Sequence, residues 1–586
     1  MAASHATWIR QRLNSVALSI LLLLLLSSTA IFVVTYQKYW TFHQILLPGL
    51  DYEYTENIRN LAITLHPEKH NRRDPAIIFH SWNITKGYRS PDGVHKLVYL
   101  INDQFPGPTI EARSGDTLEI VVSNYLEDEE VVAIHWHGLH MRGANGMDGV
   151  VGITQDAIPA RKDFTYRFEL SSTQAGTFWY HSHSELQRSD GLYGGLVIHK
   201  PIADHVADSE TYSYDQEQLL LIGDWYHRSA TDVQASYLTF MSSGHEPVPD
   251  SLLVNGLGAF NCSMAVPSRP VECVHVNSPS LSIRNGRTRL RIVNVGAMAG
   301  FNVSMHNNKM EVIQIDGGNA VIPAVATEIG ILYPGERVDV VVSLLNLDSI
   351  YITLDAELFT MQNPALTATQ TFPIVSGPKQ RSRHTIQSSH TDEREQAQPT
   401  SFDLTAGRSN QQQDLPPTAN QTFLIYTHIE MLAHYDHVPM GYMNRTNWIP
   451  QSPALISIPR DQWNEHQFMP EIVGNGEWVD IVVNNLDKDA GHPFHLHGHD
   501  FYVLIRHAFP RRAGYRTYNP FDLPADAKTM YPEPNLINPL LKDTVHIPRR
   551  GYVILRIRAD NLGLWFFHCH ILWHAGSGMA MGFVVQ

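Results

Sequence analysis

Gly115-Asp-Thr-Leu-Glu-Ile-Val-Val-Ser-Asn124 shows the pattern from which the fold of this chain can be predicted. Apolar and polar residues alternate along it, as in a β-strand with one face in a core and one in water. The same pattern, with glycine before the strand and asparagine near its end, recurs at Gly286–Asn294 and Gly476–Asn484. Three copies of one β unit are the simplest explanation.

A second alternating strand follows each copy, again after a proline. These strands are expected at 164–168, 338–342 and 552–557. Convincing amphipathic helices are few, and Gly, Pro and Asn separate short β-rich runs, which favours antiparallel sandwiches. We therefore predict an all-β chain of three consecutive Greek-key β-sandwich domains at 76–200, 210–375 and 422–586.

The composition of the 586 residues directs attention to imidazole chemistry. The chain has 32 His but three Cys, which excludes a disulfide scaffold. Its 43 Lys+Arg against 58 Asp+Glu give a net charge of −15, which repels phosphate backbones, so we expect no nucleic acid partner. With 43% hydrophobic and 17% charged residues, the composition argues against global disorder and against a polytopic membrane protein.

The amino end carries an uncharged apolar run at 16–36, about the length that crosses a bilayer. Two arginines precede it, which predicts a cytosolic tail at 1–15, a single-pass transmembrane signal anchor, and a lumenal or extracellular catalytic part. A cleaved signal peptide is the alternative, because residues 28–30 resemble a cleavage site; the protein would then be secreted. Residues 37–75 are expected to form a polar stem.

Other features agree with a glycoprotein outside the cytosol. Five N-x-S/T sequons begin at Asn83, Asn261, Asn302, Asn420 and Asn444. Cys262 and Cys273 are expected to form a disulfide, with two buried free thiols as the alternative. Residues 376–421, rich in Gln, Ser, Thr and Pro, are expected to be a flexible linker or surface insertion.

Four histidine clusters lie in the first and third units and none in the second. They are His135-Trp-His137, His181-Ser-His183, His492-Pro-Phe-His495-Leu-His497 and His568-Cys569-His570. Residues i and i+2 of a strand share a face, so each His-x-His pair presents two imidazoles side by side. One such pair is a weak signal, but four of them favour a metal cluster.

The last cluster predicts two metal centres on one strand. His568 and His570 share a face, whereas Cys569 points to the opposite one. Cys569 with His492, His574 and a weak axial Met579 supplies the ligand set of a blue-copper electron-transfer site. Zinc fits one thiolate and two imidazoles, but it gives no reason for eight further histidines.

Those eight imidazoles suffice for three more copper ions, two with three imidazoles and one with two. They are His135, His137, His181, His183, His495, His497, His568 and His570. Such a cluster leaves coordination positions open for an oxygen species. Four copper ions can store the four electrons that reduction of dioxygen to water takes.

The motifs that surround these residues resemble the four copper signatures of the multicopper oxidases. They are His135-Trp-His137-Gly138, Trp179-Tyr-His181-Ser-His183, His492-Pro-Phe-His495-Leu-His497-Gly-His499 and His568-Cys-His570-Ile-Leu-Trp-His574. The resemblance covers about residues 76–586 and implies three cupredoxin domains, with a type 1 copper in the third and a trinuclear cluster between the first and third.

The resemblance also implies which residues hold which copper. His135 and His495 match the type 2 ligands, and His499 matches a position that is not a ligand. The two type 3 ions would be held by His137, His181, His183, His497, His568 and His570.

Further segments resemble the fungal laccase-like branch. They are Asn102–Thr109, Asp224–His227 and Pro249–Gly256. Asp250 matches a laccase carboxylate that accepts a hydrogen bond from the phenol and could take its proton; a turn-forming Asp after proline is the alternative. Asp148 matches an acid that helps to protonate reduced oxygen, although Asp-Gly is also an ordinary turn.

Departures from the family bear on the substrate. Iron-oxidising members carry an acid where this chain has Ser189, although Glu185 in the same loop could substitute. They also carry an acid where this chain has Leu572, which places proton delivery by that route in doubt. Many fungal laccases have Leu or Phe at the position of Met579, and the family trend with Met is toward a milder oxidant.

We therefore expect a laccase-like oxidase that couples one-electron oxidation of electron-rich phenols to four-electron reduction of dioxygen. Polyketide pigment precursors that couple through radicals are candidate substrates. The alternatives are a metallo-oxidase (ferroxidase) working with a metal transporter, an ascorbate-type oxidase and a non-catalytic copper-binding descendant; the complete ligand set opposes the last. The expected partners are the phenol, dioxygen and a membrane, and the sequence identifies no pathway enzyme.

Overall fold

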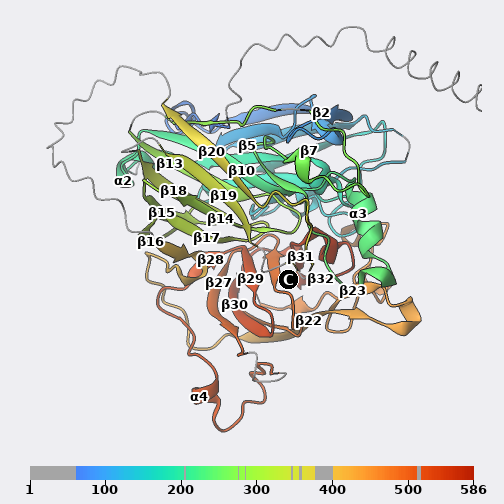
Figure 1. Ribbon diagram of the computed structural model, residues 1–586. Helices are drawn as coiled ribbons and strands as arrows, with labels where there is room; N and C mark the ends of the chain where they lie inside the picture. Colours follow the sequence, from blue (N-terminus) through green and yellow to red (C-terminus); the bar gives the residue numbers. More distant parts are fainter. Residues whose placement is uncertain are drawn as a thin grey trace, which may run out of the picture. The chain divides into compact units, whose positions relative to one another are not determined.

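The computed structural model describes residues 61–586 except 128, 203–205, 275, 284–285, 345–347, 356–358, 360, 377–399, 475 and 511–515. Strands dominate these ranges and form six sheets (Figure 1). The predicted cytosolic tail, the membrane segment or signal peptide, and the stem up to residue 60 lie outside the described residues. Within the described ranges, no helix combines the length and apolar character needed to cross a bilayer.

The first unit packs two four-stranded sheets, with strand orders β3-β2-β5-β7 and β4-β9-β8-β6. Its strands are β2 (Ile77–Arg89), β3 (Lys96–Ile101), β4 (Gly107–Arg113), β5 (Thr117–Asn124), β6 (Ile134–His137), β7 (Asp163–Glu169), β8 (Gly176–Ser182) and β9 (Tyr193–His199). Every second residue of β5 is buried, among them Leu118, Ile120 and Val122, because successive side chains of a strand point to opposite faces.

The second unit packs a seven-stranded sheet on a six-stranded one. The first sheet runs β1-β10-β13-β18-β15-β16, with β11 beside β10, and the other runs β12-β20-β19-β14-β17-β21. Its strands are β1 (Ile63–Thr64), β10 (Gln216–Trp225), β11 (Ser251–Val254), β12 (Leu281–Ile283), β13 (Arg287–Asn294), β14 (Gly300–Met305), β15 (Met310–Ile315), β16 (Asn319–Ala326), β17 (Glu328–Leu332), β18 (Arg337–Ser343), β19 (Ser349–Asp355), β20 (Thr369–Ser376) and β21 (Ser401–Asp403).

The third unit packs sheets with orders β23-β22-β25-β30-β27-β28 and β24-β32-β31-β26-β29. Its strands are β22 (Gln421–Met431), β23 (Pro439–Met443), β24 (Glu471–Ile472), β25 (Glu477–Asn485), β26 (His492–Leu496), β27 (Phe501–Ala508), β28 (Leu540–Lys542), β29 (Thr544–Ile547), β30 (Gly551–Ala559), β31 (Gly563–Cys569) and β32 (Ala580–Val585). The described α-helices are short: α2 (Asp208–Thr211), α3 (Ala230–Tyr237), α4 (Ala527–Met530) and α5 (Leu572–Ala575).

The threefold repeat predicted from the sequence is confirmed in the pairing of the strands. The two predicted strands of each unit are antiparallel neighbours, namely β5 with β7, β13 with β18 and β25 with β30. The strand that leads each unit pairs in parallel with the first of these two: β2 with β5, β10 with β13 and β22 with β25. The three units therefore share one topology at their centre.

Two predicted boundaries are wrong in part. The linker at 376–421 is structured at its carboxyl end, because β21 pairs in parallel with β17, Leu404 enters the core of the second unit and Leu415 is buried. The stem at 37–75 is structured from residue 61, because Leu61 is buried and β1 pairs with β10. A few apolar residues in a polar segment are enough to dock it once its backbone pairs with a sheet.

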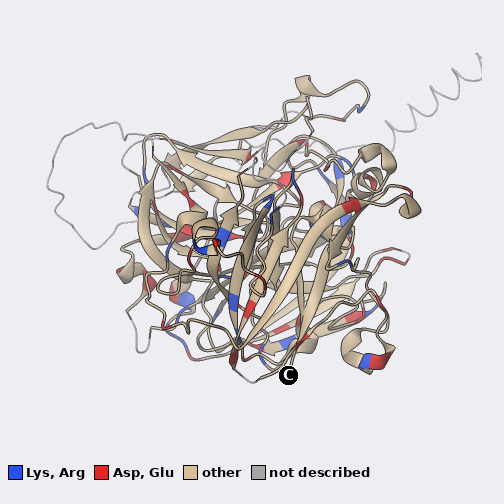
Figure 2. Cartoon of the chain, turned by 90° about the horizontal axis from the view of Figure 1, so that it is seen from below, with Lys and Arg blue, Asp and Glu red and all other residues tan. Residues whose placement is uncertain are grey.

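Buried ion pairs join the units. Arg337 of β18 donates to both carboxylate oxygens of Asp543, at 2.6 and 2.5 Å, and both side chains are almost fully buried. The Thr177 hydroxyl of β8 donates to Asp339 of β18 at 2.8 Å. Elsewhere, acidic and basic residues are interspersed along the described chain (Figure 2). The second unit is thus tied to both of its neighbours by buried polar contacts.

Replacing Arg337 by Met should strongly destabilise the protein, because Asp543 keeps its buried charge and loses its partner. We expect a loss of about 3 to 5 kcal/mol, measured as the free energy of unfolding in urea. Arg167→Met is the control, because Arg167 pairs with Glu119 at the surface; it should change the free energy by less than about 0.5 kcal/mol. Equal effects of the two substitutions would contradict the structural role of the buried pair.

Candidate copper centres

Four neighbouring strands carry the predicted ligands to the junction of the first and third units. In the first unit β6 pairs with β8, which sets His135 opposite His181. In the third unit β26 pairs with β31, which sets His495 opposite His568. The two sets meet face to face, since the ring centroids of His135 and His497 are 3.9 Å apart.

The eight imidazoles can be divided into the three groups that the family resemblance implies, although the closest ring contacts cross these groups, as between His137 and His495, whose centroids are 3.8 Å apart. The ligand nitrogens of His183, His497 and His568 lie within 4.8 Å of one another. A second group is formed by the rings of His137, His181 and His570, with centroids 4.9 to 5.8 Å apart. His135 and His495 remain, with centroids 5.7 Å apart. This division has the three, three and two imidazoles that three copper ions would require.

Most of these rings are held at one nitrogen by an acceptor outside the cluster. The Nδ1 atoms of His135, His181, His495 and His568 donate to backbone carbonyls at 2.8 to 2.9 Å. The second nitrogen is buried without a partner in five rings, namely those of His135, His137, His181, His495 and His570. A buried nitrogen without a partner is costly, so these atoms fit a metal that is bound among them.

One contact makes the fit to a metal specific. The Nε2 atoms of His497 and His568 face each other at 3.2 Å. Their Nδ1 atoms donate to Asp148 and to the carbonyl of Cys569, so in the neutral rings both Nε2 atoms carry lone pairs. Two lone pairs repel each other at this distance unless a cation lies beside both.

Burial favours the neutral form of most rings in the cluster. It lowers the pKa well below the ordinary value in His137, His181, His183, His497, His568 and His570. A neutral imidazole is the form that binds a metal. The imidazoles at the junction therefore favour binding of a metal ion over binding of additional protons.

Two carboxylates orient rings from both units. Asp148, fully buried after the short 3₁₀-helix η2 (Asn145–Met147), lies 3.2 Å from His135 Nδ1 and accepts from His497 Nδ1 at 2.9 Å. The Asp543 carboxylate lies 3.3 Å from His137 Nε2. The backbone carbonyl of Asp543 accepts a hydrogen bond from His495 Nδ1. Asp148 was predicted to act at this cluster; Asp543 was missed, although it stands next to β29, which pairs with β26.

Cys569, His492 and His574 form a compact triangle on the opposite side of β31. The sulfur lies 3.8 Å from His492 Nδ1 and 3.7 Å from His574 Nδ1, and the two nitrogens are 3.1 Å apart. Bonds of about 2.0 Å to nitrogen and about 2.3 Å to sulfur fit a metal near its centre. Met579 is buried beside this triangle, and the backbone carbonyl of Met579 accepts a hydrogen bond from the Cys569 backbone N–H at 3.1 Å.

The outer nitrogens of this triangle end on carboxylates that sequence reasoning missed. His492 Nε2 lies 2.8 Å from Asp487, five residues before it. His574 Nε2 lies 3.4 Å from Glu246 of the second unit. These carboxylates favour a proton on each Nε2 and leave both Nδ1 atoms free to bind a metal.

Among the described residues, Asp250 has no recorded contact with Cys569, His492 or His574, and its predicted role beside a phenol stays a prediction. It accepts hydrogen bonds from the His227 backbone N–H and from Asn363, at 2.9 and 3.0 Å. It lines a separate cavity of about 330 Å³ together with His227 and Phe260. Glu246, four residues earlier, is the carboxylate that reaches a ligand, and only the tertiary fold distinguishes the two.

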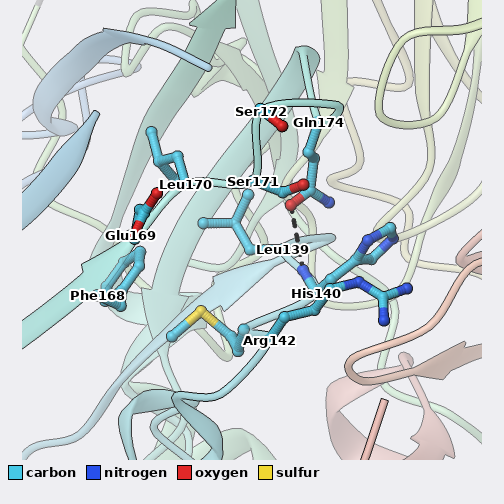
Figure 3. A pocket seen from close by; sticks show the side chains of 10 residues that line it. Leu139, His140, Arg142, Phe168, Glu169, Leu170, Ser171, Ser172 and Gln174 are labelled. Atoms are coloured by element: carbon cyan, nitrogen blue, oxygen red, sulfur yellow. Dashed lines mark hydrogen bonds between the residues drawn. The ribbon is translucent and has the colours of Figure 1, made fainter. Parts of the chain in front are cut away.

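Two further cavities lie near the clusters. A cavity of about 390 Å³ is lined by His183, His568 and Glu185. Glu185 therefore shares this cavity with two of the eight junction imidazoles. A cavity of about 280 Å³ lies beside Leu139, His140 and Gln174, whose amide oxygen accepts from the His140 backbone N–H (Figure 3). No predicted copper ligand lines the second cavity.

The remaining predicted positions are also placed. Cys262 and Cys273 form a disulfide. Asn83, Asn261 and Asn420 are exposed, as a glycosylated asparagine must be. The half-buried Asn302 and Asn444 donate their amide protons to Asp355 and to the Leu424 carbonyl, which disfavours glycosylation at these two sites. His499 is buried against Trp565 apart from the ligand groups.

Comparisons with known proteins match this architecture. Three family models described as multicopper oxidase match residues 83–202, 216–376 and 393–586. Laccase-1 of Cryptococcus neoformans var. grubii is 32% identical over 525 residues, which cover 86% of this chain and 80% of the relative. L-ascorbate oxidase of Cucumis sativus is 32% identical over 552 residues, which cover 87% and 89%.

A solved structure shows the same fold. The crystal structure of Fet3p, a multicopper oxidase that functions in iron import, superposes with a TM-score of 0.70. The two chains are 26% identical, and the match covers 87% of this chain and 90% of the other.

Cys569→Ser should abolish the blue absorption of the copper-loaded protein and its activity with every electron donor. A serine hydroxyl cannot replace the thiolate that gives a type 1 site its character. The double substitution Cys262→Ser and Cys273→Ser is the control, because it removes sulfur atoms far from the ligands. A blue or active Cys569→Ser protein would contradict the assignment of this triangle.

Proposed function

The chain belongs to the multicopper oxidase family, and on that premise we propose that it is a laccase-like oxidase of small electron-rich phenols with dioxygen as the electron acceptor. Four copper ions would occupy the sites: one at the triangle of Cys569, His492 and His574, and three among the eight junction imidazoles. Bound copper would supply one-electron transfer at the triangle and dioxygen reduction at the junction.

The observation that carries this proposal is the pair of carboxylates at the outer edge of the triangle. A phenol that loses an electron also becomes a strong acid, so its oxidation is faster when a base stands ready for the proton. Glu246 and Asp487 each lie beside the outer nitrogen of a ligand imidazole, where the electron would enter. Copper at the triangle would accept the electron of a phenolic hydroxyl group, and a carboxylate close to it would accept the proton.

The other end of the reaction also has the residues it needs. The cavity of about 390 Å³ beside His183 and His568 offers dioxygen a place next to the trinuclear group. Asp148 bridges His135 and His497 and lies where it could hold a proton for reduced oxygen. Its burial and its contacts with two predicted ligand rings support that role.

Oxidation of ferrous iron is a second candidate, favoured by the same two carboxylates. Ferrous iron is a cation that carboxylate oxygens bind well. Glu246 also lies beside Tyr237 of α3, whose hydroxyl is buried without a hydrogen-bond partner. The relationship to Fet3p, which functions in iron import, supports this candidate.

Glu246→Gln separates proton acceptance from electron transfer. We expect it to lower kcat for phenols by about 100-fold or more, because the amide cannot take the phenolic proton. Oxidation of ferrocyanide, which loses an electron but no proton, should stay near the wild-type rate. Steady-state oxygen consumption with both donors measures the difference.

Asp250→Asn is the matched control, since Asp250 is a nearby carboxylate that contacts no copper ligand. It should lower phenol turnover less than Glu246→Gln does, because the amide oxygen can replace only one of the two accepting oxygens, but neither contact involves a copper ligand. A large loss in Asp250→Asn with none in Glu246→Gln would contradict the proposed base. A wild-type kcat/KM that is higher for ferrous iron than for phenols would instead favour the second candidate.

We also propose that residues 16–36 anchor the oxidase to a membrane with its copper centres on the lumenal or extracellular side. The support is the apolar run with arginines before it. Alkaline carbonate extraction of cell membranes should leave the full chain in the pellet and release a version that begins at residue 37. Release of the full chain would indicate cleavage of the segment.

A further inference from the structure

Asn561 lies in the turn before β31, and its buried side chain bridges two units. Only 3% of its surface is exposed. The amide nitrogen donates to the backbone carbonyl of His140 in the first unit at 2.6 Å and to that of Gly498 in the third unit at 2.7 Å. A side-chain amide has two N–H donors, so both are engaged here, each with a different unit.

The two carbonyls belong to turns that follow segments with predicted copper ligands. His140 comes three positions after His137, with which β6 ends, and Gly498 is next to His497, which follows β26. Asn561 itself precedes β31, the strand that carries two further predicted ligands. One side chain therefore joins the ends of three segments that bring ligands together.

The rings on these segments meet closely across the junction. The centroids of His137 and His495 are 3.8 Å apart, and those of His135 and His497 are 3.9 Å apart. Yet β6 and β26 belong to different sheets, so no ladder of backbone hydrogen bonds joins these two described strands. Contacts made outside the sheets must hold them at this separation. The Asn561 amide supplies such a contact, and it acts through backbone carbonyls rather than through the rings.

Both turns are also held from their other sides. Gln174 of the first unit accepts from the His140 backbone N–H at 3.3 Å (Figure 3). Gly498 has a φ of +70°, and a Cβ atom on it would lie 2.3 Å from the Trp565 ring. Trp565 in turn donates its indole N–H to the Asn561 carbonyl at 2.8 Å. The bridge thus connects two well-held turns, so a change in its length is passed on to the ligand segments.

Charged contacts cross the same gap. His140 Nε2 lies 3.2 Å from a carboxylate oxygen of Asp500, in the turn after β26. Burial lowers the pKa of His140, but the Asp500 carboxylate raises it above its ordinary value, so the two side chains attract each other. Arg142 donates to the backbone carbonyl and the carboxylate of Asp560, at 2.9 and 2.8 Å. These contacts support the Asn561 bridge between the same two units.

We propose that Asn561 is a positioning residue of the junction, which sets the distance between the ligand segments of the first and third units and thereby their affinity for copper. Metal–nitrogen bonds are about 2.0 Å long and tolerate deviations of about 0.2 Å, so segments that drift apart bind a metal more weakly. The inference rests on the proposed copper occupancy of the junction, and it holds whether the electron donor is a phenol or ferrous iron.

The experiment compares release of copper from the two centres of Asn561→Leu in the copper-loaded full chain. Leucine has nearly the size of asparagine but no donor. EDTA is added, and the copper content, the near-ultraviolet absorption of the type 3 pair and the blue absorption are followed over time. Copper of the junction should be released about 10-fold faster than in wild type. The blue absorption should decay at the wild-type rate, because the triangle lies on the opposite side of β31.

Asn255→Leu is the matched control. Asn255 also donates to two backbone carbonyls, those of Leu61 and Leu219, at 2.5 and 2.8 Å, but both belong to the second unit. Its φ of 49° adds strain to a leucine, so the melting temperature should fall at least as far as in Asn561→Leu. The control should nevertheless release junction copper at the wild-type rate.

A wild-type rate of junction copper release in Asn561→Leu would overturn the inference alone. Equal acceleration in Asn255→Leu would also overturn it, because lower stability would then explain the effect. If Asn561→Leu does not fold, Asp500→Ala decides: faster release from the junction with wild-type decay of the blue absorption supports the inference, and a wild-type rate overturns it. A wild-type protein that binds no copper at the junction would overturn the proposed function as well.

Discussion

Eight imidazoles that meet between two sandwich domains, seven of them buried and His183 half-buried, are the constraint on which the rest of this structure depends. Each ring must give its proton to something outside the cluster, or its lone pair cannot face inward. Backbone carbonyls serve four of the rings, and the Asp148 carboxylate serves His497. The acceptors come from the same strands and turns that carry the ligands, so the β-sandwich supplies both the metal site and its support.

The sequence was sufficient for those parts of the fold and site that follow from strand periodicity. The spacing of His568, Cys569 and His570 already implies two faces and two centres, because the period of a strand is two residues. The repeat at Gly115, Gly286 and Gly476 predicted the three units for the same reason. Such inferences need no knowledge of which segments meet in space.

What could not be predicted depends on contacts between units. Glu246 and Asp250 are both acids in one loop, and only the packing of the second unit on the third shows which one reaches His574. Asn561 is separated from His140 by 421 positions in sequence, and no periodicity relates them. The burial of Leu404 and Leu415 was not predicted, because the average composition of their polar segment hides the few apolar residues that dock it.

The second unit holds no predicted copper ligand, yet it governs both centres. Arg337 compensates the charge of Asp543. Burial alone would raise the pKa of Asp543, but the nearby guanidinium holds this pKa well below its ordinary value. That carboxylate lies beside His137, so the second unit acts on the junction through one ion pair. Glu246 brings the same unit to the outer edge of the triangle. Substitutions in the second unit can therefore act on the copper ligands without changing any of them.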